Sequence, residues 1–131
     1  MTPNRRSNDN GHGTIHDELT ALCRQWSEAM GRGDVEAIMS FFAEDAVFVI
    51  AGAPLVRGAA AIRERFGAGL NEGRPAPTFE PGQIWESGDL VVDVGSIHIA
   101  GDPPRRGKYV VVWERQANGS LKALVDAPST D

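Results

Sequence analysis

The stretch GKYVVVWERQANGSLKALVDA, residues 107–127, decides the fold. It contains two runs rich in β-branched, aromatic and other apolar residues, 108–116 and 121–127, which are typical of strands. Between them lies Asn118-Gly119, a pair that favours the positive φ angles of a tight hairpin turn. The stretch therefore predicts an antiparallel β-hairpin near the end of the chain.

Two more strands are predicted immediately before this hairpin, over residues 78–86 and 90–100. The turn Ser87-Gly88-Asp89 joins them. A further strand is predicted earlier, over 46–50, where β-branched and aromatic residues follow one another. The second half of the chain thus predicts a run of antiparallel strands.

The first half of the chain carries helical patterns. Thr14 is a suitable N-cap, and apolar residues then recur at spacings of four and three through Ile15, Leu19, Leu22, Trp26 and Met30. Asp34 is positioned to cap a second helix over 35–42. A third helix is predicted over 58–66. Helices followed by antiparallel strands predict an α+β domain whose helices cover one face of a curved sheet.

The composition is that of one globular domain. The chain has 131 residues, of which 41% are hydrophobic and 24% charged, so it can bury a core without metals or disulfides. The net charge of −5 argues against nucleic acid or an anionic membrane as a partner. Residues 1–13 contain no apolar side chain after Met1 and are predicted to form a flexible tail, with a single domain over 14–131.

Cysteine content and missing motifs narrow the chemistry. Cys23 is the only cysteine, so no intrachain disulfide forms, and without a signal peptide we expect a cytoplasmic protein. No apolar run approaches the roughly 18–20 residues of a membrane-spanning helix. The sequence has no P-loop, dinucleotide-binding glycine motif, serine-hydrolase elbow or metal-ligand spacing. We therefore expect no cofactor and no metal.

Several local strings together resemble the cone-shaped α+β superfamily that includes nuclear transport factor two, steroid Δ-isomerases and the SnoaL-like polyketide cyclases. The strings are Trp26-Ser-Glu-Ala-Met30, Gly33-Asp34, Phe41-Phe-Ala-Glu-Asp45-Ala-Val-Phe48, Arg57-Gly-Ala-Ala-Ala-Ile-Arg63, Gly107-Lys-Tyr-Val-Val-Val-Trp113 and Asn118-Gly119-Ser120. The C-terminal strings are most similar to the small stand-alone, isomerase-like branch. The resemblance implies a cystatin-like roll, with a curved antiparallel sheet wrapped around three N-terminal helices and a pocket inside.

Steroid isomerases of this superfamily use a tyrosine in the first helix, a basic aspartate on the first strand and a second aspartate on a later strand. The matching positions here are Trp26, Ile50 and Val112–Trp113, so all three chemical groups are missing. An indole N–H donates a hydrogen bond but does not titrate, and Ile50 cannot take a proton. The resemblance therefore implies the fold without the steroid-isomerase residue set.

Two titratable residues, His98 and Asp126, are the candidate catalytic pair. Alternate residues of a strand share a face, and alignment with the superfamily through Gly88-Asp89 puts Ser96 and His98 on the inner face. His98 titrates near neutral pH, and Asp126 can orient it or act as the base. Each can instead serve structure by bonding its neighbours, and Asp93 becomes the group of interest if the opposite face is the inner one.

An apolar wall with few polar groups is the usual make-up of a small-molecule site. The residues expected to line it are Trp26, Met30, Phe42, Phe48, Ser96, Tyr109 and Trp113. Aromatic residues at these spacings also suit a packed core, so the same set is consistent with a cone filled by its own side chains.

The sequence leaves three functions open. One is a cofactor-free isomerase, cyclase or hydratase-like enzyme acting on an apolar small molecule. The alternatives are a non-catalytic ligand-binding protein and a dimeric association module. A homodimer through the sheet is expected in each case, because the last strands are apolar on both faces: Val110 and Val112 on one, Val111 and Trp113 on the other.

Overall fold

A computed structural model describes residues 5–6, 14–69 and 75–131. Within these residues the helices are α1 (Thr14–Arg32), α2 (Val35–Met39) and α3 (Ala59–Gly69), and the strands are β1 (Arg5–Arg6), β2 (Phe42–Phe48), β3 (Val56–Arg57), β4 (Thr78–Ser87), β5 (Leu90–Ile99), β6 (Arg105–Arg115) and β7 (Leu121–Thr130). The strands form one sheet in the order β1-β4-β5-β6-β7-β2-β3. All neighbouring strands run antiparallel except β2 and β7, which run parallel.

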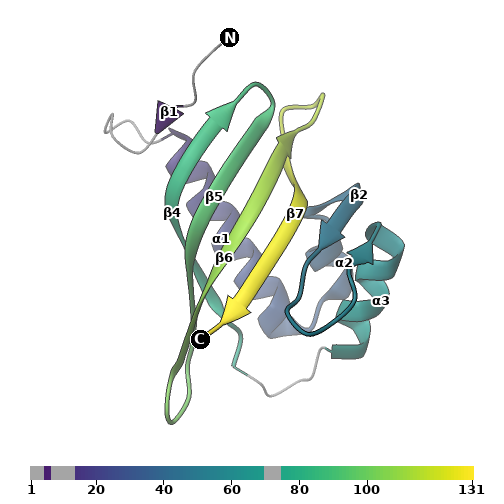
Figure 1. Ribbon diagram of the computed structural model, residues 1–131, viewed down its shortest axis with the longest axis vertical. Helices are drawn as coiled ribbons and strands as arrows, with labels where there is room; N and C mark the ends of the chain where they lie inside the picture. Colours follow the sequence, from purple (N-terminus) through teal and green to yellow (C-terminus); the bar gives the residue numbers. More distant parts are fainter. Residues whose placement is uncertain (1–4, 7–13, 70–74) are drawn as a thin grey trace.

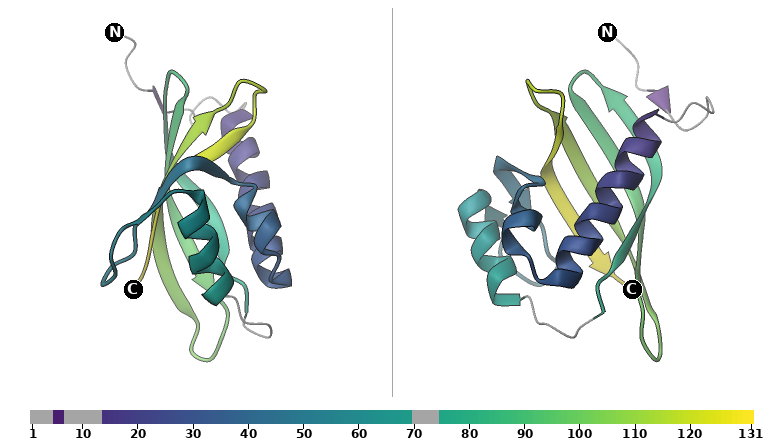
Figure 2. Two further views of the ribbon diagram at one scale, coloured as in Figure 1. Left: turned by 90° about the vertical axis from the view of Figure 1, so that its right-hand side faces the viewer. Right: turned by 180° about the vertical axis from the view of Figure 1, so that it is seen from behind.

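The three helices lie on the same face of this sheet (Figure 2). The helix α1 crosses behind the long strands, and α3 lies beside β2 at one edge (Figure 1). The long strands twist and curve, so the sheet and helices together form an open α+β cone. This confirms the predicted fold class.

The helix α1 faces the sheet with one apolar stripe. Ile15, Leu19, Cys23 and Trp26 are all at most 7% exposed. The stripe follows the predicted spacing, although Cys23 is buried more deeply than its neighbour Leu22. The sheet-facing side of α1 is thus set by local periodicity, as expected for an amphipathic helix.

The second helix is shorter than predicted. The Asp34 side chain caps it as expected, accepting a hydrogen bond of 3.0 Å from the backbone N–H of Ala37. The helix ends at Met39 rather than continuing to residue 42, and Phe42 instead begins β2 opposite Ala123 of β7. Long-range pairing with β7 outweighs the local helical pattern, because a short helical segment has little stability of its own.

Two bulges control which side chains reach the inner face. Val112 pairs with Val125 and Trp113 with Ala123, so Leu124 is an extra residue on β7. The second bulge lies on β4 between Glu80 and Gln83. A bulge reverses the inward and outward alternation beyond it.

The described part of the predicted tail is a short strand. Arg5 and Arg6 form β1 and pair with Glu86 and Trp85 of β4. The rest of residues 1–13 lies outside the described residues, so the prediction of a flexible tail stays a prediction. The prediction of one domain over 14–131 also stays as stated.

Candidate functional site

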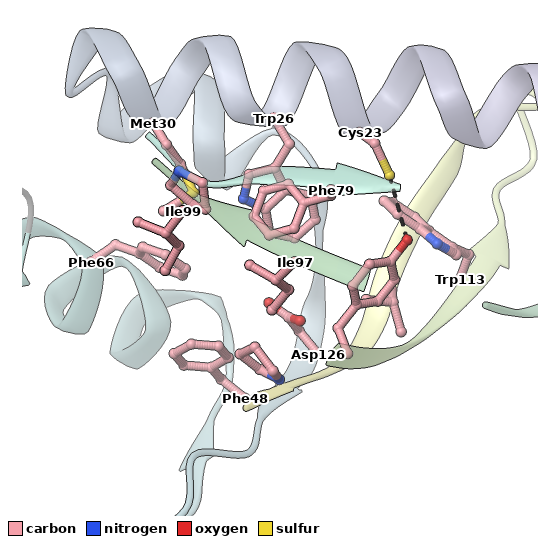
Figure 3. Close-up of a pocket in the computed structure, with 14 residues that line it drawn as sticks. Cys23, Trp26, Met30, Phe48, Phe66, Phe79, Ile97, Ile99, Trp113 and Asp126 are labelled. Atoms are coloured by element: carbon pink, nitrogen blue, oxygen red, sulfur yellow. Dashed lines mark hydrogen bonds between the residues drawn. The ribbon is translucent and has the colours of Figure 1, made fainter. Parts of the chain in front are cut away.

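A cavity of about 170 Å³ lies between the helices and the inner face of the sheet (Figure 3). The side chains around it come from α1, α3, the strands β2, β4, β5, β6 and β7, and the segment just before β4, and nearly all are apolar. They are Cys23, Trp26, Met30, Phe48, Phe66, Pro77, Phe79, Ile97, Ile99, Tyr109, Val111, Trp113, Asp126 and Pro128. The cone is therefore not filled completely by its own side chains.

Asp126 is the one carboxylate on this wall. It is 7% exposed, and no described residue forms a hydrogen bond or ion pair with its side chain. Burial without a compensating partner disfavours the charged form. This desolvation raises the pKa of Asp126 to about 7. The carboxyl group is thus poised between its protonated and ionised forms near neutral pH.

The bulge on β7 explains why Asp126 faces inward. Ala123 and Asp126 are both buried, three positions apart, although regular alternation would put them on opposite faces. Asp126 lies opposite Val111 of β6 on one side and Phe48 of β2 on the other. Asp126 therefore lies on a strand that is paired on both sides.

A second buried carboxylate, Asp93 of β5, is fully engaged. It is 1% exposed and accepts hydrogen bonds from the Tyr109 hydroxyl at 2.6 Å and from the Gly82 backbone N–H at 3.0 Å. Burial raises the pKa of Asp93, and these two hydrogen bonds oppose the rise by favouring the charged form. The β4 bulge supplies the Gly82 donor, so the bulge and the buried carboxylate depend on each other.

The Cys23 thiol extends this polar chain toward α1. Its sulfur lies 3.7 Å from the Tyr109 hydroxyl oxygen, as the dashed line in Figure 3 shows. Burial raises the pKa of Cys23 to about 11 and also raises that of the Tyr109 hydroxyl. Both groups therefore stay protonated at neutral pH, which makes Cys23 a poor nucleophile.

Five of the residues expected to bind ligand do line the cavity: Trp26, Met30, Phe48, Tyr109 and Trp113. Asp126 lines it as well. Phe42 is instead part of the core beneath it, 3% exposed, with its ring packed edge-on against Trp26 at 5.1 Å.

The predicted inward placement of Ser96 and His98 is wrong. Both side chains are exposed on the outer face of β5, whereas Asp93 and Ile97 are buried on the inner face. On the inner face, Asp93 accepts hydrogen bonds from the Tyr109 hydroxyl and the Gly82 backbone N–H. His98 and Asp126 therefore lie on opposite faces of the sheet and cannot act as a catalytic pair.

Three further wall residues were not predicted from the sequence. Ile97 and Ile99 of β5, and Phe79 of β4, line the cavity from strands whose inner faces the local pattern does not reveal. Both faces of β5 are apolar at most positions, so hydrophobic periodicity carries little information there. The signal available in the sequence was Asp93 itself, because an aspartate within an apolar run is buried only where it finds hydrogen-bond partners.

Among the described residues, no group of three or more His, Cys, Asp and Glu side chains is arranged to hold a metal ion. None of the helices in the described part of the chain is both long and apolar enough to cross a bilayer.

Comparison with known proteins identifies the family. The model of the SnoaL-like domain matches residues 23–123, which is most of the chain. The chain belongs to the SnoaL-like domain family. No curated protein matches it significantly.

Solved structures of the wider superfamily share the SnoaL-like fold of this chain. A ketosteroid isomerase-like protein from Erwinia carotovora atroseptica is 16% identical, with a TM-score of 0.71 over 90% of this chain and 95% of that one. An NTF2-like protein of unknown function from Pseudomonas putida is 19% identical, with a TM-score of 0.74 over 95% and 89%. An NTF2-like protein with a cystatin-like fold from Novosphingobium aromaticivorans is 17% identical, with a TM-score of 0.67 over 87% and 80%. Likenesses at these identities establish the fold and leave the activity to the site.

Proposed function

We propose that the cavity binds an apolar small molecule and that Asp126 moves a proton on it, making the chain a cofactor-independent acid–base enzyme of the isomerase or cyclase type. The observation that carries the proposal is the Asp126 carboxyl group, 7% exposed and unpaired by the described residues on an otherwise apolar wall. A general base works best when its pKa lies near the working pH. Burial raises the pKa of Asp126 to about 7, which meets that condition.

The rest of the wall suits this chemistry. Ionised Asp126 accepts a proton from a carbon of the ligand, and the resulting carboxylic acid returns it to another atom. Because the proton is returned, the step is an isomerisation that consumes no co-reactant. The apolar surroundings keep water away from the intermediate. Tyr109 is hydrogen-bonded to both Cys23 and Asp93, so these three groups already have partners. Among the described titratable groups of the wall, Asp126 is therefore the one available to the ligand.

A proton-exchange experiment tests the proposal. The probe is cyclohex-3-enone in heavy water, whose activated C–H protons exchange and whose double bond moves into conjugation when a base acts. Asp126→Asn should lower the exchange rate by about 100-fold or more. Asp45→Asn removes an exposed carboxylate from β2 and is the matched control. The wild-type rate should rise with pH and reach half its maximum near pH 7. An Asp126→Asn rate equal to that of the wild type would refute the acid–base role.

A ligand-binding protein without catalysis is the alternative that the same cavity supports. It would bind an apolar probe, and the bound probe would show no exchange above the buffer rate. The exchange experiment therefore separates the two functions, provided that binding is measured on the same samples.

We also propose that the chain forms a homodimer through the outer face of the sheet. The neighbouring strands β5 and β6 present Val92, Val94, Val110 and Val112 on that face, and Val94 and Val110 are 38% and 39% exposed. A sheet that is apolar on both sides is expected to be covered on both. Sedimentation should show twice the chain mass of 14.1 kDa at micromolar concentration, and a purely monomeric species would refute the dimer.

A further inference from the structure

A second hollow, of about 260 Å³, lies at the end of the sheet where β4 begins and β5 passes into β6. The connection between β5 and β6 extends beyond the ends of the neighbouring strands (Figure 1). The described residues that line the hollow are Ala76, Thr78, His98, Ile99, Ala100, Pro104, Arg105 and Arg106. Among these residues, Ile99 alone also lines the apolar cavity. The hollow is therefore a separate site with a different lining.

Basic side chains converge on this hollow. Arg106 of β6 lies directly opposite His98 of β5, and Arg105 lies opposite Ile99. Both arginines and His98 are exposed to solvent. Residues directly opposite one another in an antiparallel pair have Cβ atoms about 5 Å apart, and like charges at that spacing repel. An anion bound in the hollow would offset the repulsion between the Arg106 guanidinium and a protonated His98.

The described acidic side chains do not neutralise these arginines. The ion pairs of the described residues involve neither Arg105 nor Arg106. Asp131, directly after β7, donates its backbone N–H to the Arg106 carbonyl oxygen at 2.9 Å. Its carboxylate is instead paired with Lys108, at 2.7 Å. The positive charge of the hollow is therefore available to a ligand.

The donor set suits a phosphate group better than a carboxylate. A phosphate monoester carries about 1.5 to 2 negative charges at neutral pH and has three acceptor oxygens. Two guanidinium groups can bind it at the same time, whereas the two oxygens of a carboxylate are satisfied by one bidentate arginine. The remaining lining includes Ala76, Ile99, Ala100 and Pro104, which offer an apolar surface to an organic group that carries the phosphate.

The charge of the whole chain favours a small ligand. The net charge is −5, so a nucleic acid or an anionic membrane is repelled over an extended surface. A small anion experiences mainly the local field of the hollow, because solvent and salt screen the more distant carboxylates.

We propose that this hollow binds the phosphate group of a small phosphorylated organic molecule, with Arg105 and Arg106 holding the phosphate oxygens. The site does not depend on the acid–base function of Asp126. It also lies beyond the valines of the proposed dimer surface, because His98 is four residues past Val94 on β5, or about 13 Å along the strand.

Calorimetric titration and backbone amide NMR of the full chain with phenyl phosphate test the proposal. Phenyl phosphate should bind and shift the amide signals of His98, Arg105 and Arg106, and it should leave that of Phe48, on the cavity wall, unchanged. Benzoate, with one charge and two oxygens, should bind at least about fivefold more weakly. Phenol, which is uncharged, should leave the signals of the hollow unchanged. Binding of phenyl phosphate should weaken as the salt concentration rises.

Arginine substitutions supply the second arm of the experiment. Arg105→Gln and Arg106→Gln should each weaken phenyl phosphate binding by about 5- to 10-fold, because each removes a charged, bidentate donor. Arg65→Gln removes an exposed arginine from α3 and is the matched control for loss of one positive charge. It should change the affinity by less than about twofold, because the interaction between distant exposed charges is screened. All three side chains are exposed, so the variants should unfold at nearly the wild-type temperature.

Three results would overturn the proposal. Equal weakening by Arg65→Gln and Arg106→Gln would show a general effect of net charge instead of a site. Tighter binding of benzoate than of phenyl phosphate would refute the phosphate assignment. Tighter binding, per phosphate group, of single-stranded DNA or of vesicles containing phosphatidic acid would refute the small-molecule class.

Discussion

Replacing Asp126 by asparagine should remove most of a pH dependence that the buried carboxyl group imposes on folding. Asp126 has an ordinary pKa of 3.8 when the chain is unfolded, and burial raises the pKa to about 7 in the folded state. Between these values the folded protein holds a proton that the unfolded chain has released. Stability is therefore highest below about pH 4 and falls as pH rises through about 7.

The size of the effect follows from the two pKa values. A difference of about three between them corresponds to roughly 4 kcal/mol of unfolding free energy. The steepest loss, about 1.4 kcal/mol for each pH unit, lies between the two pKa values. An asparagine at this position is neutral at every pH, so the variant does not lose unfolding free energy through ionisation at residue 126. Asp126→Asn should thus gain roughly 4 kcal/mol relative to the wild type between about pH 4 and about pH 8.

Urea denaturation followed by tryptophan fluorescence measures this difference across the pH range. Asp93 and the surface carboxylates are present in both proteins, so their contributions cancel in the subtraction. Asp45→Asn, which removes an exposed carboxylate from β2, controls for loss of one negative charge. If the difference between the wild type and Asp126→Asn stays constant with pH, Asp126 is not a neutral buried acid, and the reasoning for its role in the cavity fails.

Three further substitutions test the framework of the site. Gly95→Ala should destabilise the fold by about 1–3 kcal/mol or more, because a Cβ there would overlap the Tyr109 ring and the backbone of β4; Gly67→Ala, in open space on α3, is the control in the same denaturation assay. Tyr109→Phe should cost about 1–3 kcal/mol in thermal or urea unfolding, because Asp93 loses one of its two donors, and an unchanged stability would contradict that role. Val110→Lys should convert a dimer into monomers in sedimentation while leaving the melting temperature of the monomer nearly unchanged, since the side chain is 39% exposed within one chain.

The elements with strong local signals were predicted closely. The strands β4, β5 and β7 start at the predicted residues, and Asn118-Gly119 forms the predicted turn between β6 and β7. Asp34 caps α2 through the expected bond to Ala37. These features depend on turn chemistry, capping and propensity within a few residues, and such terms can be read along the chain.

Elements that depend on distant partners were predicted poorly. Residues 42–45 lie in β2 because Phe42 pairs with Ala123, about eighty positions away in the sequence. The two-residue strand β3 has little strand propensity of its own, and it forms because Val56 and Arg57 pair with Phe48 and Val47 of β2. No local window contains the information for either.

The candidate site divides in the same way. The sequence by itself determined that the domain is α+β, that Trp26 faces the sheet, and that the last strand brings Asp126 into an apolar setting. Only the tertiary structure decided which face of β5 is the inner one, because the alternating positions are apolar on both sides. The decision lies in the hydrogen bonds that Tyr109 and Gly82 make to Asp93. The two hydrogen bonds offset the cost of burying the Asp93 carboxylate, so Asp93 faces inward and His98 faces solvent.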